Sequence, residues 1–383
     1  WGTSLMHEEL PGLESKGFSS TGQYGIGFFS VFMLGTKVCV TSKRFEDARG
    51  NSLTLEFNHG ITSRPILRPA IKDEIIKDGG TRIKVWVDSK TIRKLLEKRS
   101  KRYEHISLSE LIESLCPAID CNIDIRENGK IERVINANDW ITIPALDVIK
   151  RIIGNSTYSS LSKKEKTFID QLSKHMQIID EEGIGVVGRG FIYKEEHSRK
   201  NEDFFPNAGI VTLGGLRSCE LTGLIGLFKG KSDRASRDIG IPIISSNKLK
   251  EWSSNQADLL AKLDLGIETQ FNCSAVIRVC GGETGSLKIA QHKSGTLNYD
   301  ELLGIIKQSN LNQYYIVQDA AVSNYERDNN CKIDFNKDVI WVAMGTPGIL
   351  QTKSIDYYVW WPEEKHFGDE NSFSSSLEGL TTK

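Results

Sequence analysis

The sequence lacks an excess of either charge and any long apolar run. Lys and Arg number 49, and Asp and Glu 50, among 383 residues, which gives a net charge of -1. A protein dedicated to nucleic acid usually carries a basic excess, so the balance makes nucleic acid an unlikely partner class. No stretch approaches the roughly 18 apolar residues of a membrane-spanning helix, so no membrane partner is expected.

Short motifs for metal and P-loop chemistry are also missing. The seven cysteines include no CxxC pair, which disfavours a zinc site or a disulfide framework and favours free thiols in a reducing cytosol. The seven histidines form no HExxH pair, which disfavours a zinc hydrolase. Lys229-Gly230-Lys231-Ser232 is similar to the end of a P-loop, but Ile225 stands where that motif requires Gly.

Length and composition indicate a soluble protein of several domains. A chain of 383 residues accommodates two or three domains of about 100–200 residues. Its 39% hydrophobic and 26% charged residues are typical of globular proteins. The chain begins at Trp1 and shows no signal peptide. We therefore expect an N-terminally truncated chain and a cytoplasmic location.

The pattern over residues 1–140 predicts a mixed α/β unit. A compact β-branched run indicates a strand at 37–42, and period-two alternation indicates strands at 53–57 and 82–87. Helical spacing indicates helices at about 91–100 and 108–115, the second with a capping box from Ser107 and Glu110. Asn128-Gly129 between two apolar runs predicts a hairpin with a type I′ turn.

Two further domains are expected, at 141–289 and 290–383, which makes the overall class α+β or α/β. The second domain should hold a helical segment from about 145 to 182, strands at 185–193 and 209–213, and a long helix around 249–263. Residues 275–280 are either a further strand or the end of this unit. The third should hold a helix at 299–308 and strands at 314–318 and 339–344. Tyr357–Trp361 is either a buried last strand or an exposed aromatic patch for partners.

The strongest chemical signal is a glycine-rich segment before an apolar helix expected at 28–34. Gly22, Gly25 and Gly27 give the spacing G-x-x-G-x-G, which is not the dinucleotide fingerprint. Glycines that lead into a helix N-terminus let backbone N–H groups approach phosphates, and the helix dipole favours negative charge there. A plain turn into a buried helix explains the same spacing, so spacing alone leaves both interpretations open.

Two motifs together resemble the ninety-kilodalton heat-shock chaperones of the GHKL ATPase superfamily. The segment from Gly22 to Ser30, GQYGIGFFS, is similar to their lid-closing glycine motif, and a strand at 37–43 follows it. Gly80-Thr81-Arg82-Ile83 is similar to the family's Gly-Thr strand, whose Thr lies at the adenine end of the pocket. The resemblance implies these nucleotide-binding residues: Gly22, Gln23, Tyr24, Gly25, Ile26, Gly27, Phe28 and Thr81.

The resemblance also implies an architecture. Residues 1–140 would be the C-terminal portion of a GHKL nucleotide-binding domain, an incomplete two-layer α/β sandwich, with residues 2–21 as its mobile lid. Residues 141–289 would be a chaperone-like middle domain with a left-handed βαβ-type core. Residues 290–383 would be a small α/β unit without clear similarity to the family's dimerisation domain, which suggests a divergent bacterial-type member.

A second-domain arginine is implied as the catalytic residue. Ser236-Arg237-Asp238, after Lys229-Gly230, resembles the family's triplet whose Arg reaches the ATP γ-phosphate. An arginine in that role stabilises charge on the transferred phosphoryl group. Arg234 is the substitute if the register slips, and an ion pair of Arg237 with Asp233 or Asp238 is the structural alternative.

The function implied by the resemblance is ATP binding and hydrolysis coupled to conformational change, with ATP and Mg²⁺ as cofactors. The partner would be a protein that is remodelled, and the whole protein could be a homodimer. The family's Mg²⁺-binding Asn, catalytic Glu and adenine-binding Asp would precede Trp1, so enzymatic activity of this chain stays open. Two alternatives remain: a GHKL ATPase of the mismatch-repair or topoisomerase type acting on DNA, and a non-catalytic interaction protein that retains the fold.

Overall fold

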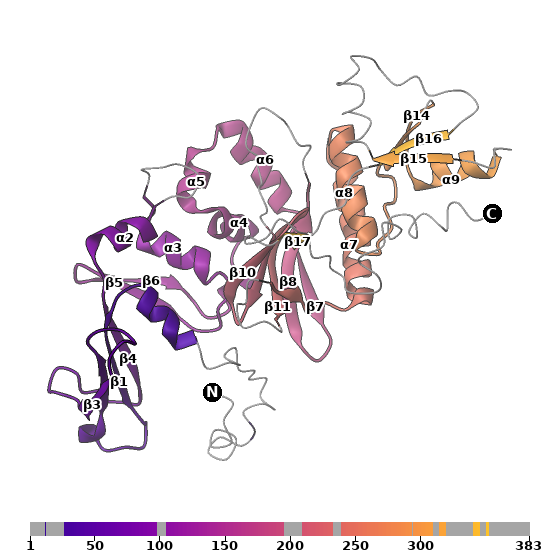
Figure 1. The fold of residues 1–383 in the computed structure, drawn as a ribbon. Coiled ribbons are helices and arrows are strands. Elements are labelled where there is room, and N and C mark those ends of the chain that lie inside the picture. Colours follow the sequence, from indigo (N-terminus) through magenta and orange to yellow (C-terminus); the bar gives the residue numbers. More distant parts are fainter. Residues whose placement is uncertain are drawn as a thin grey trace. The chain divides into compact units, whose positions relative to one another are not determined.

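The structure, a computed structural model, contains helices and sheets in two compact units, Trp1–Leu108 and Ser109–Lys383 (Figure 1). The residues that it describes are 12, 27–97, 105–194, 209–232, 239–292, 294–308, 314–318, 340–344 and 350–351. Most strand pairs are antiparallel, and helices and strands are mixed along the chain. The α+β class is therefore confirmed.

The first unit is built on a four-stranded antiparallel sheet with the order β3-β2-β1-β4. The elements of this unit, with 3₁₀ helices labelled η, are η2 (Gly27–Met33), β1 (Lys37–Lys43), η3 (Arg49–Asn51), β2 (Leu53–Phe57), β3 (Ile66–Pro69), β4 (Gly80–Trp86) and α2 (Ser89–Leu95). The strands predicted at 37–42, 53–57 and 82–87 are confirmed as β1, β2 and β4. The short edge strand β3 carries no such signal, because it spans only four residues and ends in a proline.

The second unit begins with a helix and a hairpin. Its first elements are α3 (Leu108–Leu115), β5 (Ile123–Glu127), β6 (Lys130–Ile135) and η4 (Asp139–Ile141). Asn128 and Gly129 between the strands have φ values of 49° and 81°. Two successive positive φ angles define a type I′ turn, so the predicted hairpin is confirmed.

Three helices precede the central sheet, namely α4 (Ala145–Ile153), α5 (Asn155–Ser160) and α6 (Lys163–Ser173). A capping box starts α6: the Glu165 N–H donates to Ser162 Oγ at 3.3 Å, and the Ser162 N–H donates to Glu165 Oε2 at 2.6 Å. The sequence Ser-Lys-Lys-Glu carries that signal. The helical segment expected at 145–182 is confirmed as far as Ser173, but it is wrong at its end, where Gln177–Glu181 form strand β7.

The central sheet has the order β17-β10-β9-β11-β8-β7, and β12 pairs with β11. Its strands are β7 (Gln177–Glu181), β8 (Gly185–Ile192), β9 (Gly209–Leu213), β10 (Leu216–Leu221), β11 (Leu224–Lys231), β12 (Ile241–Pro242) and β17 (Leu350–Gln351). Helix α4 packs against β11, whereas α7 (Ser246–Leu260) and α8 (Ile267–Val279) pack against β8. The sheet therefore lies between two groups of helices (Figure 1).

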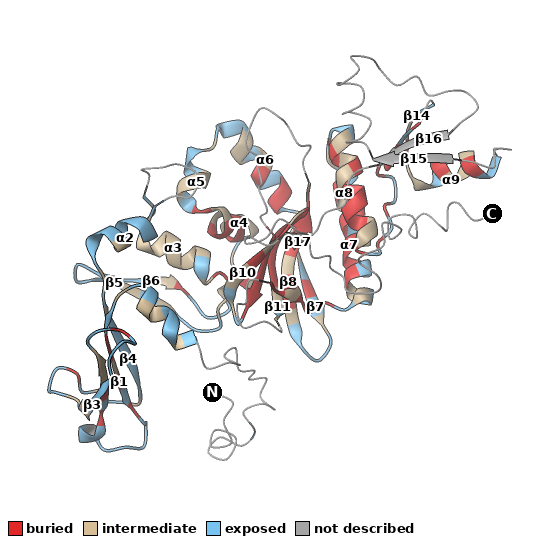
Figure 2. Ribbon diagram, in the orientation of Figure 1, coloured by how far each residue is buried: buried red, intermediate tan, exposed pale blue. Residues whose placement is uncertain are grey.

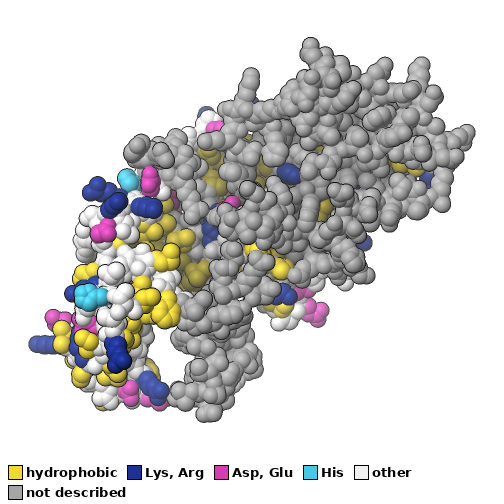
Figure 3. Space-filling model, viewed as in Figure 1, with side chains coloured by type: hydrophobic (Ala, Val, Ile, Leu, Met, Phe, Trp, Pro, Cys, Tyr) yellow, Lys and Arg dark blue, Asp and Glu magenta, His cyan; other side chains and the backbone are white. Residues whose placement is uncertain are grey.

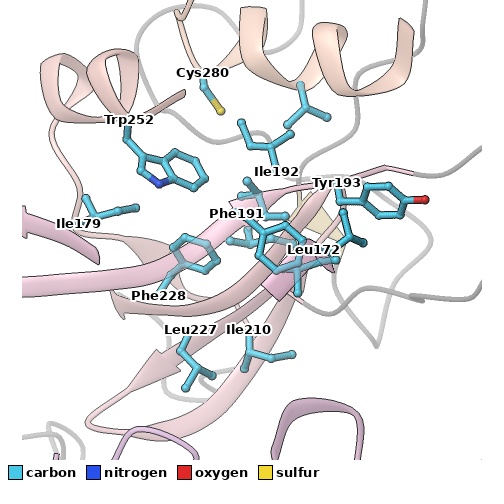
Figure 4. Packing of buried hydrophobic residues seen from close by; sticks show 14 of the residues in the cluster. Leu172, Ile179, Phe191, Ile192, Tyr193, Ile210, Leu227, Phe228, Trp252 and Cys280 are labelled. Carbon is cyan, nitrogen blue, oxygen red and sulfur yellow. The ribbon is translucent and has the colours of Figure 1, made fainter. Parts of the chain in front are cut away.

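The main hydrophobic core lies in this second unit, on both sides of the central sheet (Figure 2). Phe228 of β11 meets Trp252 of α7 edge to face, with ring centroids 6.2 Å apart (Figure 4), and Phe191 of β8 is a further large side chain of the core. Both phenylalanines have no exposed surface. Strands such as β9, which is buried at every position, are expected when helices cover both faces of a sheet.

The interpretation of 275–280 as a strand is wrong, because all but the last of these residues lie in helix α8. Phe271, Cys273, Ala275, Val276 and Ile277 of α8 are all buried. A helix buried around most of its circumference has no single apolar stripe. Its apolar stretch therefore resembles a short buried strand when only the sequence is considered.

The last described elements form a small sheet with the order β14-β13-β16-β15 and one helix. They are β13 (Ala290–His292), β14 (Gly295–Leu297), α9 (Tyr299–Gln308), β15 (Tyr314–Gln318) and β16 (Ile340–Met344). The predicted helix and both predicted strands are confirmed. Tyr357–Trp361 lies outside the described residues, and the domain boundaries at 140/141 and 289/290 stay predictions.

Candidate functional site

Of the three glycines in the motif, the structure describes only Gly27, which is the first residue of the 3₁₀ helix η2. A Cβ atom placed on Gly27 would meet nothing within 4 Å, so packing in the protein does not require a glycine there. The Ser30 hydroxyl donates to the Gly27 carbonyl at 2.7 Å. The space beside the Gly27 backbone is therefore open to an approaching group.

Aromatic contacts attach η2 to one end of the sheet. Phe28 and Phe32 of η2 lie with their ring centroids 5.9 and 5.0 Å from that of Phe57 on β2. Phe57 pairs with Val38, a fully buried residue of β1. Edge-on and tilted contacts at these distances are favourable. They hold Phe28, the residue after Gly27, against the sheet.

The face of the sheet on which Phe57 lies is apolar and largely exposed. Alternation along the strands assigns these residues to it: Val38, Val40, Leu53, Leu55, Phe57, Leu67, Ile83 and Val85. Leu53, Leu67 and Ile83 are 48%, 65% and 51% exposed. Figure 3 shows hydrophobic side chains in patches over the surface of the first unit. An apolar sheet face of this kind normally packs against another layer or a ligand.

Thr81 lies on the same face, at the end opposite to Phe57. It pairs with Ser42 of β1, and the two hydroxyl oxygens are 3.1 Å apart. Ser42 is four residues beyond Val38 along β1, which corresponds to about 13 Å of extended strand. The Gly27–Phe28 end and the Thr81 end are therefore joined by a continuous apolar floor.

The other face of the sheet carries a polar cluster that the sequence pattern did not reveal. Arg68 of β3 donates to Glu74 through Nη1 at 2.7 Å and Nη2 at 2.9 Å, and through Nε to Glu56 at 3.0 Å. Thr54 also donates to Glu74 at 3.1 Å, and Thr41 Oγ1 lies 2.9 Å from Thr54 Oγ1. The cluster links β1, β2 and β3 to the 70–79 loop.

Charge and burial in this cluster shift two pKa values in ways that indicate a structural role. Hydrogen bonds from Arg68 lower the pKa of Glu74 to about 2, although burial opposes that shift. Burial raises the pKa of the Cys39 thiol, and the nearby Glu56 and Glu74 raise it further. Glu74 is 7% exposed, so its carboxylate is closed off from substrates.

The catalytic arginine implied by the resemblance is not among the described residues. Arg237 and its substitute Arg234 both lie between β11 and β12, whose ends pair as Gly230 with Pro242 and Lys231 with Ile241. Just before that segment, Lys229 Nζ lies 5.7 Å from the centroid of the buried Trp140 ring. This cation–π contact links β11 to η4.

The structure thus brings Gly27, Phe28 and Thr81 to one face of one sheet. The other nucleotide-binding candidates, Gly22, Gln23, Tyr24, Gly25 and Ile26, lie outside the described residues. Ser42 is the polar residue on this face that sequence reasoning missed. The sequence of β1 alone does not mark Ser42 as a site residue, because its position beside Thr81 follows only from the pairing of β1 with β4.

No protein-family model matches the chain. Within the described ranges, no group of three or more His, Cys, Asp and Glu side chains is arranged to hold a metal ion. None of the helices in the described part of the chain has the length and apolar character needed to cross a bilayer.

Proposed function

We propose that the first unit binds ATP and belongs to a GHKL-type ATPase similar to the ninety-kilodalton heat-shock chaperones. One observation carries the proposal: Phe28, which follows Gly27, and the Ser42–Thr81 hydroxyl pair lie toward opposite ends of one open apolar face. Val38, the strand partner of Phe57, and Ser42 are about 13 Å apart along β1, a span that suits an extended nucleotide. The phosphates would meet the glycine backbone, and the base would meet the hydroxyls.

The apolar floor suits a purine base. Ligand sites are typically apolar with a few polar groups that fix orientation, and Val40, Leu55 and Ile83 form such a floor beside Thr81. Its exposure also fits a GHKL two-layer sandwich, in which a helical layer covers the sheet and encloses the nucleotide. This finer architecture and the left-handed βαβ-type core of residues 141–289 belong to the same proposal.

Magnesium and hydrolysis require groups that this face does not carry. Mg²⁺ prefers carboxylate and other hard oxygen ligands, whereas the residues assigned to the open face are apolar apart from two hydroxyls. The described residues therefore do not fit a magnesium site here. The resemblance assigns the γ-phosphate contact to Arg237, which would act on bound ATP.

The proposed biological activity is ATP-driven conformational change that remodels a protein partner in the cytoplasm. The balanced charge of the chain, 49 basic against 50 acidic residues, favours a protein partner over DNA. A homodimer of the whole protein belongs to the same proposal.

Binding of N-methylanthraniloyl-ATP, followed by fluorescence and by competition with unlabelled ATP, tests the proposal. Gly27→Ala should weaken binding about tenfold or more, a loss of about 1.4 kcal/mol, because the methyl group would meet the phosphates. Gly50→Ala is the matched control, since a Cβ atom at Gly50 also meets nothing within 4 Å. Failure of the unmodified chain to bind, or equal binding by both variants, would overturn the proposal.

A further inference from the structure

Two hydroxyl groups stand together on an otherwise apolar surface. Ser42 and Thr81 are direct cross-strand partners, and both are exposed. Their oxygens are 3.1 Å apart, and Ser42 Oγ is also 3.4 Å from the Gly80 carbonyl oxygen. The residues nearest to the pair on the same face are Leu53, Val40 and Ile83. A ligand on this part of the face would therefore find its polar partners in these two hydroxyls.

The number of protons in the Ser42–Thr81 pair limits the hydrogen bonds that the pair can make to a ligand. Each hydroxyl has one proton and two lone pairs. The mutual hydrogen bond uses one proton and one lone pair. The Ser42 hydroxyl can also donate to the Gly80 carbonyl at 3.4 Å, a long hydrogen bond. A ligand that displaces this contact finds one free proton and further lone pairs, so the pair then presents one donor and one acceptor side by side. Either oxygen can donate within the pair, so the donor and acceptor can exchange places.

We propose that Ser42 is a specificity-determining residue of the nucleotide site, which closes a ring of hydrogen bonds with Thr81 and the edge of a purine. This inference rests on the proposed function. With a 6-aminopurine, the amino group donates to Ser42 Oγ, the Ser42 hydroxyl donates to Thr81 Oγ1, and the Thr81 hydroxyl donates to ring N1. Every proton in the ring has one acceptor, and such closed chains strengthen each of their members.

The same pair accepts a 6-oxopurine when every hydrogen bond reverses. Ring N1–H then donates to Thr81 Oγ1, the Thr81 hydroxyl donates to Ser42 Oγ, and the Ser42 hydroxyl donates to the oxo group. A purine without a substituent at position 6 cannot close the ring. The pair therefore selects 6-substituted purines as a class, and it does not distinguish the amino from the oxo group.

The test compares dissociation constants for ATP, inosine triphosphate and purine riboside triphosphate. The unmodified chain should bind ATP and inosine triphosphate about tenfold more tightly than purine riboside triphosphate, since a missing hydrogen bond is worth about 1.4 kcal/mol. Ser42→Ala should remove that preference and leave purine riboside triphosphate binding unchanged. Ser42→Thr retains the hydroxyl and should restore the preference.

The outcomes separate this inference from the proposed function. If Ser42→Ala weakens all three nucleotides equally, Ser42 only supports the sheet and the inference fails. If Gly27→Ala abolishes binding while Ser42→Ala leaves every dissociation constant unchanged, the nucleotide site stands and the inference fails. If the unmodified chain binds none of the three nucleotides, both fail.

Discussion

Arg68 holds both carboxylate oxygens of Glu74, at 2.7 and 2.9 Å, on the face of the first sheet that faces away from the candidate site. A bidentate pair of this kind fixes geometry as well as charge. Thr54 and the Ile71 N–H also donate to Glu74, each at 3.1 Å. The carboxylate therefore connects β2, β3 and the loop before β4, and thereby supports the strand that carries Thr81.

Stability of the first unit should fall at acid pH because of Glu74. Its pKa lies near 2 in the folded protein against an ordinary 4.5. A depressed folded-state pKa contributes stability that is present above 4.5 and lost as the pH falls toward 2. Tm measured from pH 6 to pH 2 should drop through this window, and Glu74→Gln should flatten the drop. The exposed Glu46→Gln variant should retain the full drop, and a drop of equal size in Glu74→Gln would contradict the assignment.

Gly154→Ala should destabilise the second unit. Gly154 has a φ of 93°, and a Cβ atom there would lie 2.5 Å from Glu110 Oε1. That same oxygen accepts from the Ser156 hydroxyl at 2.6 Å, so Glu110 cannot move away without losing this contact. We expect a loss of about 1–3 kcal/mol from the strained backbone and the displaced carboxylate, measured by urea unfolding.

A contrasting glycine provides the control for this prediction. Gly304 lies within helix α9, and a Cβ atom there meets nothing within 4 Å. Gly304→Ala should be neutral or stabilising by up to about 1 kcal/mol, because alanine loses less conformational freedom in a helix. Equal effects of the two substitutions would show that the conformation at Gly154 imposes no special requirement.

Gln256→Leu should cost about 1–3 kcal/mol, because it leaves buried polar groups without partners. Gln256 Oε1 accepts the Ile192 N–H at 3.1 Å, and Nε2 donates to the His175 carbonyl and to Gln177 Oε1 at 3.2 and 2.8 Å. Calorimetric or chemical unfolding measures the change. Gln171→Leu, on the exposed side of α6, should change stability by less than about 0.5 kcal/mol. A buried variant as stable as the unmodified chain would contradict the prediction.

The candidate site was predictable only in part. The glycine motif led to Gly27 and Phe28, and the Gly-Thr strand led to Thr81, because each signal is contained in a short stretch of sequence. The partnership of Thr81 with Ser42 spans 39 positions and depends on the register between two strands. Glu74 was missed for a similar reason, since its partner Arg68 lies on an edge strand without alternation.

Sequence alone determined the elements that depend on local chemistry. A β-branched run specified β1, alternation specified β2 and β4, and Asn128-Gly129 specified a turn with two positive φ angles. Tertiary structure alone decided that α8 is a helix, that the polar face of the first sheet is the covered one, and that the apolar face is open. The physical reason is that local backbone preferences act over a few residues, whereas burial and cross-strand pairing depend on residues far apart in the chain.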